Sequence, residues 1–235
     1  MGAIYRKEMK TYFTSPIAYA FLAVFYLFTG YYFVGVNIYG ATTNLSSVFA
    51  SVFSIMMVLL PLLTMRLFTE EKKQKTEQGL LTAPVNLYEI VLGKFFAAST
   101  IFIFGMLIYV VFALTLKGIA GSVEIASTVG NFIALFLLGT SFIAIGIFIS
   151  STTENQVVAS ILSFIVIFFF YMIDTLSSML KIEFISKILN KLSFYTRFTE
   201  VSTGILDITS IVFFISVILI FNFLTIRVLE KRRWA

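Results

Sequence analysis

The chain has 235 residues, of which 59% are hydrophobic and only 12% are charged. Soluble domains carry about 25% charged residues, so this composition excludes a soluble globular class and indicates a membrane protein. Cysteine and histidine are both absent, which excludes disulfides, thiolate metal sites and acid–base catalysis by histidine. The net charge of +5 comes without a basic patch interleaved with aromatic residues, and we therefore expect no nucleic-acid partner.

The first 15 residues predict a helix that lies in the membrane interface ahead of the first span. Tyr5, Met9, Tyr12 and Phe13 recur at helical spacing and form an apolar stripe, while basic residues occupy the remaining face. Two roles are open for this helix. It is either an interfacial anchor, or it also contacts the layer of the protein outside the membrane.

Six apolar runs follow, and each has roughly the 20 residues that a helix needs to cross the hydrocarbon core of a bilayer. Barrel strands alternate in polarity and are only about 10 residues long, so the uniform runs favour helices. The sequence therefore predicts an all-α, polytopic membrane protein, with one domain over residues 1–235 and both termini on one side. The predicted spans cover residues 17–36, 48–65, 95–116, 128–149, 157–173 and 208–229.

A charged loop, residues 66–94, separates the second and third spans. We expect the second span to continue into it as a charged helix, supported by Glu71 and Lys75 at i, i+4, and to fray near Gly79. Leu80 and Leu81 are apolar residues next to charges in a segment that water surrounds, a pattern typical of a docking surface. The candidate docking residues are Glu70, Glu71, Thr76, Glu77, Gly79, Leu80, Leu81, Thr82 and Pro84.

Two further connections carry polar residues. In the link between the fourth and fifth spans, Thr153 and Gln156 fit a capping box, and a role near a transport gate is the alternative. Residues 174–207, between the fifth and sixth spans, have apolar side chains at three- and four-residue spacing. This pattern predicts an external amphipathic segment that either lies flat on the outer leaflet or forms a lid.

Lysine and arginine are distributed unequally between the two sides of the predicted bundle. Twelve lie with the termini and with residues 66–94. The other five are Lys117, Lys181, Lys187, Lys191 and Arg197. Because basic residues are enriched in cytoplasmic segments, this division predicts a multi-pass protein of the cytoplasmic membrane with both termini in the cytoplasm.

The interiors of the spans lack the ionisable residues that a proton-coupled transporter needs. Arg66, Lys117, Asp174 and Asp207 all lie at span ends. The driving force is therefore expected outside the membrane, although sodium can be bound by carbonyl and hydroxyl oxygens alone. The sequence also has no phosphate-binding G-x-x-x-x-G-K-[S/T] motif. We predict that the chain is not an enzyme and binds no cofactor or metal.

Several segments resemble permease subunits of type-2 ATP-binding-cassette (ABC) exporters, in particular the gliding-motility type. They are AIYRKEMKTYFTSPIAY from Ala3, PLLTMRLFTEE from Pro61, LLTAPV from Leu80, VLGKF from Val91, SSTTENQ from Ser150, and LSFYTRFTEVSTGILD from Leu192. The resemblance implies a six-span subunit that pairs with a second copy or a homologue. It also implies two ABC ATPase subunits that bind ATP and Mg²⁺, a possible gliding-motility-like auxiliary subunit, and a bacterial inner membrane.

The docking loop departs from the pattern G-T-x-E-x-L-L-T-x-P of these permeases at three positions. Lys75 replaces glycine, Gln78 replaces glutamate and Gly79 replaces an apolar residue. Glu77, one residue earlier, is a candidate substitute for the missing carboxylate.

The resemblance implies that this loop transmits motion of the ATPase to the second and third spans. It also implies that the second and fifth spans line a dimer interface, where Met56, Met57, Phe164 and Phe168 are candidates for an apolar path. Ordinary packing or lipid contact explains the same residues equally well. A membrane scaffold that docks an ATPase and an auxiliary extracytoplasmic protein without transport is the alternative function.

Overall fold

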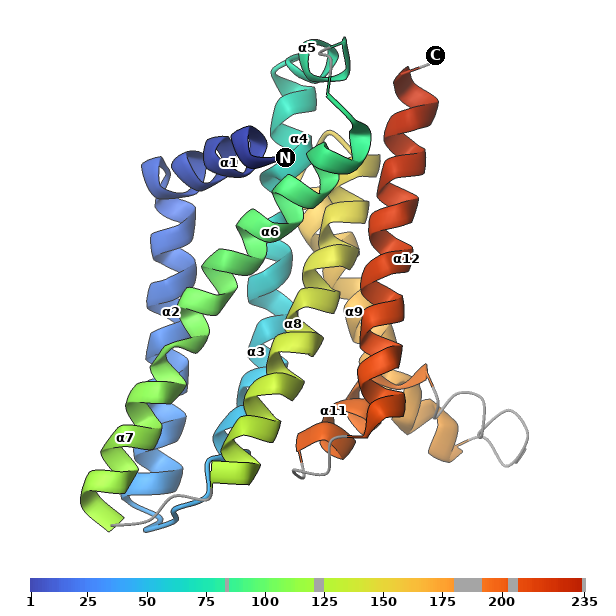
Figure 1. The fold of residues 1–235 in the computed structure, drawn as a ribbon. Coiled ribbons are helices and arrows are strands. Elements are labelled where there is room, and N and C mark those ends of the chain that lie inside the picture. Colours follow the sequence, from blue (N-terminus) through green and yellow to red (C-terminus); the bar gives the residue numbers. More distant parts are fainter. Residues whose placement is uncertain (83–84, 121–124, 180–191, 203–206, 234–235) are drawn as a thin grey trace.

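The computed structural model describes residues 1–82, 85–120, 125–179, 192–202 and 207–233, and every regular element in them is helical (Figure 1). The all-α prediction is therefore confirmed. Six helices in the described residues are long and apolar enough to cross a membrane, as the sequence predicted. They run over Pro16–Ile38, Ser46–Lys73, Leu87–Ile119, Ser127–Thr152, Gln156–Leu176 and Ile208–Arg233.

These spans are built from the following elements in chain order. They are α1 (Gly2–Thr14), α2 (Pro16–Tyr32), the π-helix η1 (Phe33–Ile38), α3 (Ser46–Thr64), α4 (Arg66–Lys73), α5 (Glu77–Thr82), α6 (Leu87–Met106), α7 (Ile108–Ala120), α8 (Ile125–Thr152), α9 (Gln156–Met179), α11 (Phe194–Ser202) and α12 (Ile208–Arg233).

The longest helix, α8, lies at the centre of the bundle and is the most enclosed of the six spans. It packs against α3, α6, α9 and α12. Glycines permit part of this close approach: a Cβ atom on Gly139 would meet the ring of Phe102, and one on Gly146 would meet the hydroxyl of Thr64. Small residues serve the same purpose at helix contacts in membrane proteins generally.

Helix α1 crosses the end of the bundle at an angle to α2 (Figure 1). The chain turns at Ser15, whose backbone is extended, and Pro16 begins α2 at its first position, where its missing N–H costs nothing. The predicted apolar stripe agrees with the structure at Tyr12, which is buried, and in part at Tyr5 and Met9, which are partly buried against the core. The buried residues of α1 are Ile4, Glu8 and Tyr12, which share one face at spacings of four, whereas Phe13 is exposed.

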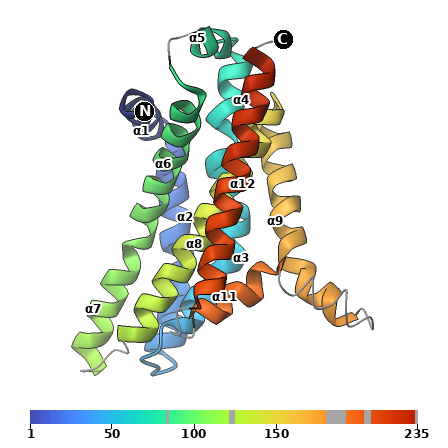
Figure 2. The ribbon, with the colours of Figure 1, turned by 45° about the vertical axis from the view of Figure 1, so that its right-hand side comes forward.

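Both termini lie at the same end of the bundle as α4 and α5, and we call this the termini end (Figures 1 and 2). The shared location agrees with an even number of spans. The compartment that the termini end faces stays a prediction.

At the opposite end, the short helix α11 fills the space beneath α8, α9 and α12. Its Phe194 is fully buried and stacks on Phe170 of α9, with ring centroids 4.8 Å apart. The predicted external segment thus includes the last turns of α9 and all of α11. Residues 180–191, which carry most of the predicted amphipathic stripe, lie outside the described residues.

Candidate functional site

A cluster of four charged side chains at the termini end, three of them buried and Lys7 exposed, joins three helices. Lys94 of α6 has a side chain only 1% exposed, and its Nζ donates to Glu8 Oε1 of α1 at 2.8 Å and to the Leu67 carbonyl of α4 at 2.6 Å. Glu71 Oε2 of α4 lies 3.0 Å from the same Nζ. Lys7 Nζ of α1 donates to the other oxygen of Glu71 at 2.6 Å. We call Lys7, Glu8, Glu71 and Lys94 the charged cluster.

The charged cluster is neutral as a whole, which offsets the cost of removing its members from water. Lys94 also lies 4.9 Å from the centroid of the Phe68 ring, a favourable cation–π arrangement. Partial burial of Lys7 acts to lower its pKa, but the hydrogen bond and charge of Glu71 outweigh burial and raise the pKa. Lys7 therefore stays protonated at neutral pH. The cluster holds α1, α4 and α6 together by charge-assisted contacts.

The predicted pairing of Glu71 with Lys75 is wrong, because α4 ends at Lys73. Lys75 has a φ of 57°, its N–H donates to the Lys72 carbonyl, and the N–H of Thr76 donates to the Glu71 carbonyl, both at 2.9 Å. These two bonds define a Schellman turn, in which the residue with positive φ stops the helix. Lys75 is therefore off the helix face that carries Glu71. Gly79, where fraying was expected, lies inside the next helix, α5.

A second set of polar contacts fastens α4 to the end of α8. The Lys72 ammonium donates to the carbonyl of Ser151 and, at 3.2 Å, to that of Thr153. The hydroxyl of Ser150 accepts the N–H of Phe68 at 3.0 Å. The last carbonyls of a helix have no partner within the helix and attract cations. Lys72 thus serves as a C-terminal cap for α8, supplied by another helix.

The capping box predicted for α9 is also wrong. Asn155, directly before the first helical residue, accepts the N–H of Val157 at 2.9 Å through its side-chain oxygen. Asn155 therefore occupies the N-cap position. Thr153 lies two residues earlier, and its carbonyl accepts a hydrogen bond from Lys72 instead.

Helix α5 lies beside the C-terminal end of α12 in both ribbon views (Figures 1 and 2). Glu77 Oε1 accepts from Arg232 Nη1 of α12 at 3.2 Å. Glu77, the candidate substitute for the glutamate missing from the loop pattern, is thus paired with another residue of the same chain. The backbones of Leu80, Leu81 and Thr82 form the end of α5, but their side chains, and Pro84 as a whole, lie outside the described residues. Docking through Leu80 and Leu81 stays a prediction.

The remaining docking candidates lie around the end of α4. Glu70 pairs with Arg66 one turn earlier at 2.9 Å. The Thr76 hydroxyl donates to the Glu71 carbonyl at 3.2 Å, which reinforces the turn. Gly79 has open space where a Cβ atom would be. Together with the charged cluster, Glu70 and Thr76 line a polar cavity of about 400 Å³ between α1 and α4.

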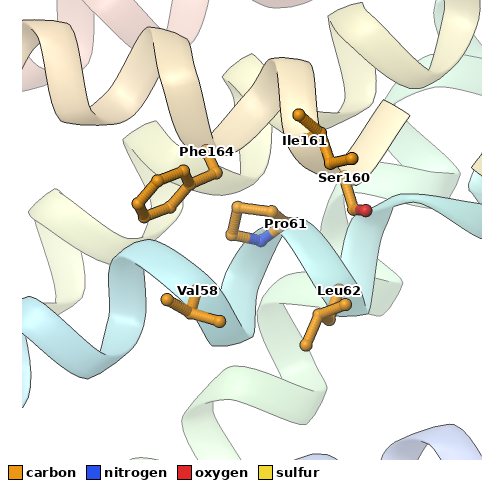
Figure 3. A pocket seen from close by; sticks show the side chains of 6 residues that line it. All are labelled: Val58, Pro61, Leu62, Ser160, Ile161 and Phe164. Carbon is orange, nitrogen blue, oxygen red and sulfur yellow. The ribbon is translucent and has the colours of Figure 1, made fainter. Parts of the chain in front are cut away.

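The four candidates for an apolar path do not share one surface. Met56 and Met57 of α3 are buried within the chain. Phe168 of α9 is 41% exposed and stacks on the half-buried Phe164 at 5.7 Å. An apolar cavity of about 280 Å³ opens between α3 and α9 (Figure 3). It is lined by Val58, Pro61, Leu62, Ser160, Ile161 and Phe164. Of the four, only Phe164 lines this cavity, and the role predicted for the set stays a prediction.

From the sequence, Lys94 was placed at the end of the charged loop, among the basic residues of the termini side, and Glu8 was not singled out. The positions of these two residues in the sequence could have indicated that they are buried. Glu8 stands midway between Ile4 and Tyr12 on one helical face, and Lys94 lies seven residues inside α6, which begins at Leu87. A charge on the buried face of a helix needs a partner of opposite sign nearby. The pairing of these two residues could not be read from their positions alone, because 86 residues separate them.

Comparison with known proteins gives one family. A family model described as "ABC-2 family transporter protein" matches residues 2–231, nearly the whole chain. No curated protein matches the chain. Membership makes the chain a transmembrane ABC transporter subunit and implies association with ABC ATPase subunits. In the part of the chain that the structure describes, no group of three or more acidic residues could hold a metal ion. Because the family model matches nearly the whole chain, the chain belongs to the ABC-2 family of transporter proteins.

Proposed function

We propose that this chain is the permease subunit of an ATP-driven exporter, in which separate ABC ATPase subunits hydrolyse ATP and α5 receives their motion. The observation that carries the proposal is the mounting of α4 and α5 at the termini end (Figure 1). Helix α4 is bound to α1 and α6 by the charged cluster and to α8 by Lys72. Helix α5 follows directly on α4, and a short helix held by an element with this many attachments is suited to transmit motion.

A coupling element works only if a push at one end moves something at the other. The Schellman turn after α4 has satisfied backbone bonds, and α4 continues the line of α3 through Met65. Packed helices and ion-paired elements move between discrete arrangements rather than bending continuously. Displacement of α5 is therefore passed to the membrane helices.

The other parts of the complex are proposed from the resemblance and from the distribution of charge. A second permease copy or a homologue completes the transport path, with the outer face of α9 around Phe168 as a candidate contact. The unequal distribution of lysine and arginine supports a cytoplasmic termini end in a bacterial inner membrane. A gliding-motility-like auxiliary subunit is proposed from the resemblance of the N-terminal and loop motifs.

Replacement of Leu80 and Leu81 by aspartate tests the proposal. If both leucines are buried against the ATPase, they contribute about 3–6 kcal/mol of docking free energy, at about 1.5–3 kcal/mol each. The double variant should reach the membrane normally but no longer co-purify with the ATPase. Gln74→Asp, an exposed change in the same loop, is the matched control and should retain the ATPase. Wild-type co-purification by the double variant would contradict docking through α5.

A further inference from the structure

We infer that the ion pair between Glu77 of α5 and Arg232 of α12 is a coupling contact, through which displacement of α5 moves α12 and the central helix α8. The inference rests on the proposed function, because it assumes that an ATPase acts on α5. It differs from the expectation of the loop motifs, in which the second and third spans carry the motion. Glu77 and Arg232 are positioning residues in this scheme.

Helix α5 is attached to α12 as well as to its neighbours in the chain. Its main contacts are with α4, the element that precedes it in the chain, and with α12. The Glu77–Arg232 contact spans 155 residues of sequence. In Figures 1 and 2, α5 lies at the same end of the molecule as the last turns of α12, which it contacts. Besides the chain itself, which joins α5 to α4 and α6, a force on α5 can therefore pass across this ion pair into α12.

Helix α12 is in turn the main partner of α8. No other two helices in the described part of the chain pack as extensively against each other. The contact includes the rings of Phe148 and Phe221, 5.7 Å apart, and the hydroxyl of Ser141, which donates to the carbonyl of Phe214 at 3.4 Å. Because such an interface is closely packed, a shift of α12 along its axis displaces α8 as well.

The connection through α4 reaches the same helix. Lys72 of α4 caps the end of α8 through the carbonyls of Ser151 and Thr153. The routes through α4 and through α12 thus converge on α8. Since α8 is the most enclosed of the spans, it contacts most of the bundle and is well placed to distribute the motion.

Exchange of the two residues separates coupling from stability. The side chains of Arg232 and Glu77 are 34% and 16% exposed, so the pair is partly buried, and reversal of one charge alone is expected to cost some stability as well as the contact. Charge reversal breaks the contact, and exchange of the two residues restores it with the opposite polarity.

The test uses the complex of the permease with its co-purified ATPase in liposomes. Because the chain has no cysteine, Val212→Cys, an exposed position on α12, can be labelled with an environment-sensitive fluorophore. The signal is the fluorescence change on adding ATP with orthovanadate. We expect Glu77→Arg and Arg232→Glu each to lose most of this change, and the double variant that combines them to recover it.

The matched control is the pair Arg227 and Glu230, 2.6 Å apart on α12 itself. Exchange of these two residues rearranges the charges on the same end of α12, keeps their sum unchanged and leaves the contact with α5 in place, so the fluorescence change should stay at the wild-type level. Three results would overturn the inference: no change in the unaltered complex, a full change in both single variants, or no recovery in the exchanged double variant. Absence of the ATPase from the purified complex is scored separately on a gel and would overturn the proposed function as well.

Discussion

Replacing Lys94 by methionine tests the charged cluster most directly. Methionine keeps most of the side-chain length but removes the ammonium that lies 2.8 Å from Glu8 Oε1 and 3.0 Å from Glu71 Oε2. Glu71 retains Lys7 at 2.6 Å. Glu8 is left with Lys7 at 4.0 Å, in a side chain only 8% exposed. One carboxylate thus becomes nearly unpaired in a buried position.

The expected cost follows from that geometry. Breaking a buried ion pair by removing one partner destabilises a protein by about 3–5 kcal/mol, because the other charge stays buried. For a chain of this length, each kcal/mol lowers the unfolding midpoint by about 2–4 °C, so the midpoint should fall by about 6–20 °C. Adding Glu8→Gln removes the stranded charge. The double variant should therefore recover part of the loss, with a coupling energy of about 0.5–3 kcal/mol.

The assay is thermal unfolding of the purified permease in detergent, followed by its helical circular dichroism. Lys73→Met is the matched control, since Lys73 is an exposed lysine of α4 and should change stability by no more than about 0.5 kcal/mol. If Lys94→Met unfolded at the same midpoint as the control, the charged cluster would not be a compensated buried unit. Greater instability of the double variant than of Lys94→Met would refute the same reasoning.

Three other predictions follow from local geometry. Lys75→Gly should raise stability by about 1 kcal/mol, because φ is 57° there and glycine adopts that conformation without steric cost; a lower unfolding midpoint would contradict this. Gly146→Ala should lower stability by about 1–3 kcal/mol through overpacking against α3, whereas Gly118→Ala, which meets open space, should be tolerated, and equal midpoints would count against the packing argument. In intact cells an impermeant thiol reagent should label Thr43→Cys and miss Gln74→Cys; the reverse pattern would invert the proposed orientation.

The sequence by itself determined the class of protein and the number of spans. Crossing a bilayer depends on the summed hydrophobicity of about 20 consecutive residues, which needs no knowledge of neighbouring helices. For this reason the number of spans was predicted correctly. The helices of the structure extend beyond the predicted ends; α6, for example, begins at Leu87, whereas the third span was predicted to begin at Phe95. The family motifs are likewise local strings, and the family match over residues 2–231 confirmed the ABC-2 type of permease.

The tertiary structure alone decided which charges face one another. A local rule paired Glu71 with Lys75, but that rule assumes an unbroken helix, and the positive φ of Lys75 ends α4 first. The actual partners of Glu71 are Lys7 and Lys94, which come from α1 and α6. The contact of Glu77 with Arg232 likewise depends on α12 returning to the termini end. Hydrophobicity adds up along the chain, whereas an ion pair depends on distances between helices that are set only when the bundle packs.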